Sequence, residues 1–72
     1  MIEEVDFYKA LGNRIKTIRN NKNISLESLS NEISVSVYVL SMIESGKVVK
    51  NELFTLYKIC KVLNITFEDL IK

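Results

Sequence analysis

The side chains that could bind a ligand are mainly basic and hydroxyl groups, and they are unevenly spread along the chain. Two stretches carry the positive charge: Lys9, Arg14, Lys16, Arg19 and Lys22 in the first, and Lys47, Lys50, Lys58 and Lys61 in the second. No acid lies between Phe7 and Leu26, and Glu52 is the only acid in the second stretch. Because the formal net charge is only +1, it is this segregation that favours a surface able to meet phosphate groups.

Few other residues could carry out catalysis or bind a metal. The chain has no histidine, no glycine-rich phosphate loop and no evident pair of carboxylates, and 72 residues leave little volume for a cleft. Cys60 is the single cysteine, so it can form neither an internal disulfide nor a cysteine metal cluster, and we expect it to be buried in a helix. We therefore expect no enzyme, no metal or other cofactor, and no small-molecule substrate.

The composition describes one domain over residues 1–72. The sequence contains no proline, two glycines and 47% hydrophobic residues, and it has no linker, repeat or low-complexity stretch. A domain of this size buries only about 60% of its extended-chain surface, so added stabilisation by self-association is expected. The longest apolar run is too short to span a membrane, and the chain begins with acids where a secretory signal would be basic. These features favour a cytoplasmic protein.

Hydrophobic residues at intervals of three and four predict five helices. The first covers about residues 6–20, the second 25–32, the third begins after Ser36 and ends at Ser45–Gly46, the fourth covers 52–63 and the fifth 66–71. Each helix has a polar residue near its start that could cap it: Asp6, Ser25, Ser36, Asn51 and Thr66. The sequence therefore predicts a compact all-α five-helix bundle.

The second and third helices are predicted to form a helix-turn-helix at about residues 25–45. Leu26, Leu29 and Ile33 share one helical face, Val35 fills the elbow between the helices, and Leu40 and Ile43 continue the same core. Such a motif presents its second helix to the major groove of DNA. The segment thus predicts DNA binding.

The chain resembles the lambda-repressor-like (Cro-like, XRE-type) helix-turn-helix family from about Leu11 to its end. The matching residues are Arg14–Ile15, Arg19, Ser25, Leu29, Val35, Ser41, Ile43–Glu44, Gly46–Lys47, Leu63 and Ile65, with one extra residue in the loop after Gly46. The resemblance implies a lambda-repressor-like DNA-binding fold and a sequence-specific transcription regulator, either a small repressor or switch protein or the N-terminal DNA-binding part of a longer regulator. Two positions depart from the family: Leu26 stands where many members have a glutamine that braces the DNA contact, and Ser34 replaces a turn glycine.

The resemblance also assigns the residues that read bases. Val37, Tyr38 and Met42 match the family's base-reading positions, and Ser41 lies beside them. Valine and methionine cannot make bidentate hydrogen bonds to a base, but they can pack against thymine methyl groups. We therefore expect recognition of an A·T-rich, two-fold operator in double-stranded DNA, with Tyr38 as the leading specificity residue.

A second set of residues is predicted to bind phosphates. Lys47 and Lys50 lie in the loop between the third and fourth helices, which in the family follows the DNA backbone. The Ser25 hydroxyl and the exposed amides of the first turn of the second helix are also available to a phosphate. Arg19, Ser36 and Ser45 complete the predicted phosphate-binding set.

Arg14 and Glu44 are predicted to form a structural ion pair. At 100° per residue, Arg14 lies on the apolar side of the first helix, where a charge needs a partner. Glu44 lies at the edge of the core face of the third helix, and in the family a matching arginine and glutamate pair. The bridge would hold the third helix against the first.

A two-fold operator implies a homodimer. Leu70 and Ile71 are the predicted interface residues, with Leu53 and Phe54 as further candidates, whereas Ile65 and Phe67 are better suited to the core of the monomer. An alternative function is also open. The third helix lacks long polar side chains at the base-reading positions, so the chain could instead be a protein-interaction module whose apolar third helix binds a partner regulator.

Overall fold

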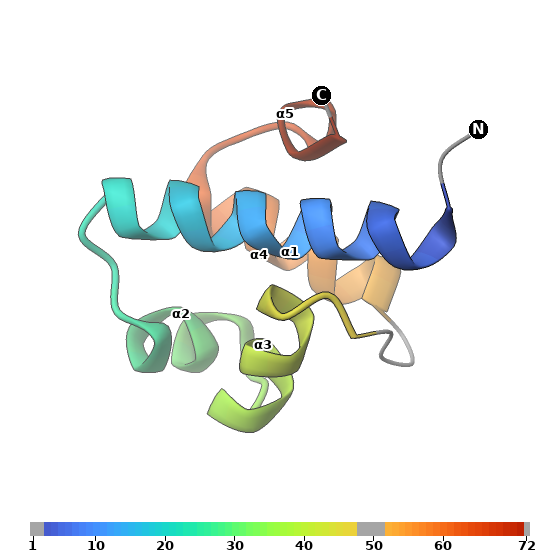
Figure 1. The fold of residues 1–72 in the computed structure, drawn as a ribbon. Helices are drawn as coiled ribbons and strands as arrows, with labels where there is room; N and C mark the ends of the chain where they lie inside the picture. The colour runs from blue at the N-terminus through green and yellow to red at the C-terminus, as the bar shows by residue number, and fades with distance from the viewer. Residues whose placement is uncertain (1–2, 48–51, 72) are drawn as a thin grey trace.

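The computed structural model describes residues 3–47 and 52–71, which form five α-helices and no strand. The helices are α1 (Glu4–Asn21), α2 (Leu26–Ile33), α3 (Val37–Glu44), α4 (Glu52–Leu63) and α5 (Phe67–Ile71). In Figure 1, α1 crosses the molecule with α4 behind it, α2 and α3 lie on one side of this layer, and α5 lies on the other. The predicted all-α five-helix fold is confirmed.

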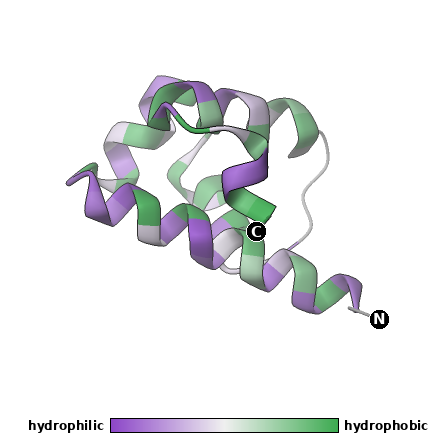
Figure 2. Ribbon diagram, turned by 90° about the horizontal axis from the view of Figure 1, so that it is seen from above, coloured by the Kyte–Doolittle hydropathy of each residue, from purple (hydrophilic) through white to green (hydrophobic). Residues whose placement is uncertain are grey.

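One core is shared by all five helices. Its buried side chains are Leu11 and Ile15 of α1, Leu29 and Ile33 of α2, Leu40 and Ile43 of α3, Leu56, Ile59, Cys60 and Leu63 of α4, and Leu70 of α5. The hydropathy of α1 alternates along its length, as a helix with one buried face requires (Figure 2). Cys60 is buried as predicted, and this burial raises the pKa of its thiol.

The helix-turn-helix begins both of its helices with a serine cap. Ser25 Oγ accepts a hydrogen bond from the Ser28 amide at 3.0 Å, and Ser36 Oγ accepts one from the Val39 amide at 3.0 Å. Each bond satisfies one of the amides that a first turn leaves without a partner. Both predicted caps are therefore confirmed, while Asn51, the predicted cap of α4, lies outside the described residues.

The other two helix starts differ in how closely they follow the sequence prediction. The Thr66 and Asp69 side chains cap α5 reciprocally: Asp69 N–H donates to Thr66 Oγ1 at 3.1 Å, and Thr66 N–H donates to Asp69 Oδ2 at 2.9 Å. The predicted cap Asp6 is wrong, because α1 already begins at Glu4 and places Asp6 inside its first turn. There the carboxylate still favours the positive end of the helix dipole.

The turn between α2 and α3 uses a residue in the left-handed region. Ser34 has φ 60° and ψ 41°, a conformation that a glycine adopts without steric cost. The Val35 amide then donates to Ser30 O at 3.1 Å, and the Val35 side chain packs against the core as predicted. Serine therefore makes the turn that the family usually makes with glycine.

Both glycines of the chain lie where α1 meets the end of α3. A Cβ atom on Gly12 would clash with Ile43 O and would lie only 2.7 Å from Glu44 O. Gly46 has φ +86°, and a Cβ atom there would lie 2.6 Å from Lys9 Cα. The backbone of α1 thus touches the last turn of α3 and the residues after it, and this contact fixes the position of α3.

Neither a membrane span nor a metal-binding cluster is found in the described part of the chain. Across residues 3–47 and 52–71, no helix combines the length and apolarity needed to cross a bilayer. In the same ranges, no three side chains from histidine, cysteine, aspartate or glutamate come together to hold a metal ion.

Candidate nucleic-acid interface

The outward face of α3 is apolar and exposed. Tyr38, in the first turn, has 72% of its surface exposed, and Val37 has 39%. Ser41 and Met42, one turn further on, are half-buried at the edge of the same face. The four residues predicted to read bases therefore lie on the accessible side of α3, away from the side chains that it gives to the core.

The hydroxyl groups of Ser41 and Ser45 are already engaged as donors. Ser41 Oγ donates to Tyr38 O at 2.8 Å, and Ser45 Oγ donates to Ser41 O at 2.8 Å. Since a hydroxyl has one proton and two lone pairs, each oxygen is left as an acceptor only. Ser41 can accept from a base amino group, but Ser45 has no proton for a phosphate in this rotamer.

Ser25 and Ser36 have the opposite hydrogen-bonding role. Each hydroxyl oxygen accepts from a backbone amide of its own helix, so each keeps its proton for an external acceptor. Both residues are exposed and lie at helix N-termini, where free amides and the helix dipole favour anions. Lys47, three residues after the end of α3, is also exposed, and Lys50 lies outside the described residues.

The buried ion pair uses a different arginine from the predicted one. Arg19 Nε donates to Glu44 Oε2 at 2.7 Å and Arg19 Nη2 donates to Glu44 Oε1 at 3.0 Å, and the two side chains are only 8% and 6% exposed. The predicted Arg14–Glu44 pair is wrong in its basic partner, because both carboxylate oxygens bind Arg19 and Arg14 lies at an exposed position on α1. Glu44 is the acidic partner of the pair, as the sequence predicted.

Arg19 is not placed to bind phosphate, so that prediction is also wrong. The residue is 7% exposed, and its remaining nitrogen Nη1 donates to Ile24 O at 2.8 Å. Hydrogen bonding to Glu44 raises the pKa of Arg19 despite the opposing effect of burial. A permanently charged guanidinium therefore joins the end of α1, the residue before Ser25 and the last residue of α3.

The C-terminal helix corrects the predicted dimer interface. Leu70 is 2% exposed and belongs to the core, because α5 folds back over α1 (Figure 1). Leu70 therefore cannot meet a second subunit, whereas Ile71 is 45% exposed and can. Ile65 packs against the core as expected, but Phe67, also assigned to the core, is 44% exposed.

These features together define a helix-turn-helix domain whose outward helix is open to a nucleic acid. The sequence of residues 14–72 matches the family of Cro/C1-type helix-turn-helix DNA-binding domains. The chain belongs to this family. Since a domain of this kind binds DNA, the exposed face of α3 is the candidate DNA interface.

Two solved structures are similar in fold and sequence. The clp gene regulator ClgR from C. glutamicum has a TM-score of 0.80 and 30% identity, with 90% of this chain and 82% of that chain covered. An HTH_3 family transcriptional regulator from Vibrio cholerae has a TM-score of 0.80 and 28% identity, with 94% of this chain covered but only 38% of the Vibrio chain. No curated protein matches the sequence.

Proposed function

We propose that this chain is a transcription regulator that inserts the N-terminal half of α3 into the DNA major groove. The observation that carries the proposal is the exposure of Tyr38 and Val37 at the start of a helix whose other side is held in the core. In this motif, the N-terminal residues of the second helix are the ones that reach base edges. The similar ClgR and Vibrio proteins are described as regulators.

The side chains of this face favour A·T-rich DNA. Val37 and Met42 offer only apolar contacts, which suit the methyl group of thymine. Tyr38 adds a ring and a hydroxyl, and Ser41 adds an oxygen that can accept from the amino group of adenine or cytosine. Because no bidentate donor is present on this face, specificity would depend on methyl contacts, on Tyr38 and on DNA shape.

The backbone contacts would come from both helix starts and from the loop after α3. The Ser25 and Ser36 hydroxyls and the adjacent amides would each hold a phosphate, while Lys47 and Lys50 would add two positive charges. Such contacts set the register of the protein on the duplex without reading its sequence. A domain that occupies the groove in this way excludes other proteins from the same site, so we assign it the role of a repressor or switch, either by itself or as the DNA-binding part of a longer regulator.

The direct test is selection of bound sequences from a random duplex pool. We expect the wild-type protein to recover a two-fold, A·T-rich motif, and Tyr38→Ala to lose it, since the variant removes the largest exposed side chain of α3. Val5→Ala is the control, because Val5 is also exposed but belongs to α1, outside the helix-turn-helix. An unchanged motif with Tyr38→Ala would place base recognition elsewhere.

The salt dependence of affinity separates DNA binding from the alternative function. Two lysine contacts in each subunit predict a slope of log affinity against log salt of about −2 for a half-site and about −4 for a two-fold site. Lys47→Gln should reduce the half-site slope by about one. A slope near zero, together with retention of a protein partner on the α3 face, would instead favour the protein-interaction module.

A further inference from the structure

Ser41 and Val37 lie one turn apart on the outward face of α3 and offer two different kinds of contact. Because the Ser41 hydroxyl proton is used in the bond to Tyr38 O at 2.8 Å, its oxygen can accept a hydrogen bond but cannot donate one. The Val37 side chain is 39% exposed and carries only methyl groups. We call these two residues the Val37–Ser41 pair.

Hydrogen-bond donors are scarce on the rest of this face. Met42 has none, and Ser45 donates its proton to Ser41 O at 2.8 Å. Within residues 37–45, all of which the structure describes, the Tyr38 hydroxyl is therefore the only side-chain donor left on the outward face. Guanine presents two acceptors and no methyl group in the major groove, so it is the base that this face fits least.

The Val37–Ser41 pair fits a base that carries a methyl group beside an amino group. Thymine has the methyl group, but its neighbour is the O4 acceptor, which the Ser41 oxygen would repel. Cytosine has the N4 amino donor but lacks the methyl group. In 5-methylcytosine the two groups are neighbours on the major-groove edge, and one N4 hydrogen stays free when the other pairs with guanine. Since Cβ atoms four residues apart on a helix are about 5 to 6 Å apart, both side chains can reach one base edge.

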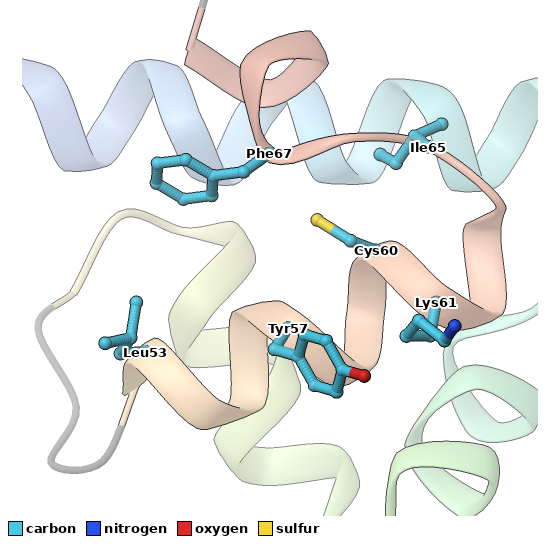
Figure 3. Close-up of a pocket in the computed structure, with 6 residues that line it drawn as sticks. All are labelled: Leu53, Tyr57, Cys60, Lys61, Ile65 and Phe67. Carbon is cyan, nitrogen blue, oxygen red and sulfur yellow. The ribbon is translucent and has the colours of Figure 1, made fainter.

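A groove on α4 and α5 has the opposite shape to the outward face of α3. Leu53, Tyr57 and Phe67 surround this groove of about 330 Å³, with the Cys60 sulfur at its inner end (Figure 3). A hollow of this kind can enclose a side chain or a small apolar molecule, but it cannot itself enter a groove of DNA. An exposed helix is convex and fits the major groove. Of these two surfaces, only that of α3 can reach the edge of a base.

We propose that the Val37–Ser41 pair recognises 5-methylcytosine, so that methylation of a cytosine within an otherwise A·T-rich site strengthens binding. This inference rests on the proposed function, since it requires α3 to lie in the major groove. Val37 contacts the methyl group, and Ser41 Oγ accepts a hydrogen bond from the N4 amino group. The protein thus responds to the modification state of its site as well as to the sequence.

The first test compares duplexes that differ in one base pair. A site is selected from a random duplex pool in which every cytosine is 5-methylcytosine. It is then synthesised with 5-methylcytosine, cytosine, or thymine opposite adenine at each methylated position. We expect loss of the methyl group to weaken binding about fourfold at a contacted position. Thymine should weaken it about tenfold, because O4 and the Ser41 oxygen are both left without a donor. Equal affinity for the three duplexes, or a selected site without 5-methylcytosine, would overturn the proposal.

Two substitutions separate the methyl contact from the hydrogen bond. Val37→Ala should remove most of the advantage of 5-methylcytosine over cytosine and keep the preference over thymine. Ser41→Ala should do the reverse. Val5→Ala and Ser28→Ala are the controls, because both residues are exposed on other helices, and they should keep both preferences. A Ser41→Ala variant that still prefers 5-methylcytosine to thymine would show that the Ser41 oxygen does not contact the base.

Methylation of adenine provides a contrast in the same assay. One N6 hydrogen of adenine pairs with thymine and the other faces the major groove. N6-methylation replaces the hydrogen that faces the groove, so the Ser41 oxygen loses its donor there. We expect duplexes methylated only at adenine to bind no more tightly than unmethylated ones. Equal gains from both modifications would indicate a general preference for methyl groups and would contradict recognition of 5-methylcytosine.

The inference and the proposed function fail in different ways. If the protein does not act on DNA, it selects no site from either a methylated or an unmethylated pool, and both proposals are overturned. If only the inference is wrong, the protein still selects an A·T-rich site that Tyr38→Ala loses, but its affinity for that site is the same with cytosine and with 5-methylcytosine.

Discussion

The two faces of α3 differ in almost every physical respect. The inner face is fixed by Leu40 and Ile43 in the core, by the close approach of Gly12, and by the bidentate bond from Arg19 to Glu44. On the outer face, Tyr38 is 72% exposed and its side chain makes no contact with the core. Packing thus restricts which side chains the inner face can carry, whereas it places no such restriction on the outer face.

This difference means that stability and DNA recognition can be altered separately. Substitutions on the inner face change the free energy of unfolding, because they disturb buried groups. Substitutions on the outer face should change affinity for DNA while leaving unfolding within about 0.5 kcal/mol of the wild type.

Glu44→Gln should give the largest loss of stability. The substitution leaves the buried Arg19 cation without a negative partner, which costs about 3 to 5 kcal/mol, and thermal and urea unfolding measure it. Glu32→Gln is the matched control, because Glu32 is exposed on α2 and should have little effect. Arg14→Met should cost much less than Arg19→Met. Equal losses for the two arginine variants would contradict the pairing that the structure gives.

Gly12→Ala should also destabilise the fold, by about 2 to 3 kcal/mol, because the added methyl group meets the backbone carbonyls of α3 and these cannot rotate away. The helix propensity of alanine offsets about 1 kcal/mol of this loss at most. Asn13→Ala, at the adjacent exposed position, controls for that propensity. A Gly12→Ala variant as stable as Asn13→Ala would mean that α1 and α3 are further apart than described.

Two substitutions at Ser36 should separate its cap from its proposed phosphate contact. Ser36→Ala removes the bond to the Val39 amide and should cost about 1 kcal/mol in unfolding. Ser36→Asp keeps a cap and adds a favourable charge at the N-terminus of α3, so stability should be retained. DNA affinity should nevertheless fall, since the carboxylate repels a phosphate. Wild-type DNA affinity for Ser36→Asp would remove Ser36 from the interface.

Ser34→Gly should produce the smallest effect, with the opposite sign. Glycine adopts the left-handed conformation of Ser34 without a Cβ penalty, but it also increases the conformational entropy of the unfolded chain. We expect the free energy of unfolding to rise by about 0.5 to 1 kcal/mol from the first effect, reduced in part by the second. Ser28→Gly, inside α2, should lose about 0.5 to 1 kcal/mol instead. Urea unfolding of both variants shows whether the turn is strained.

The sequence predicted the features of the fold that depend on neighbouring residues. The caps at Ser25, Ser36 and Thr66 and the turn at Ser34 each depend on contacts within a few residues, and all are present. The predicted Asp6 cap failed because several acids precede the apolar part of α1 and each could stand at its start. Local chemistry defines a helix start well only when a single residue can satisfy the first-turn amides.

Contacts between distant segments were predicted less well. Arg14 and Arg19 both border the apolar face of α1, and helical periodicity does not say which of them α3 approaches. One indication was available: Arg19 continues, at steps of four, the row formed by Leu11 and Ile15, which are the most buried residues of α1. Leu70 was misplaced for a similar reason, since only the path of α5 over α1 shows that its side chain faces the core.

The three hydrogen bonds of Arg19 would affect how the protein recognises the width of a DNA groove. One planar guanidinium ties the carbonyl of Ile24, beside Ser25, to Glu44, beside Ser45 and close to Lys47. These bonds therefore hold the start of α2 at a fixed distance from the end of α3. Lysine would keep the charge but not the rigid, planar set of donors. Arg19→Lys should therefore let the start of α2 and the end of α3 move relative to each other, and should reduce the protein's discrimination between DNA grooves of different width.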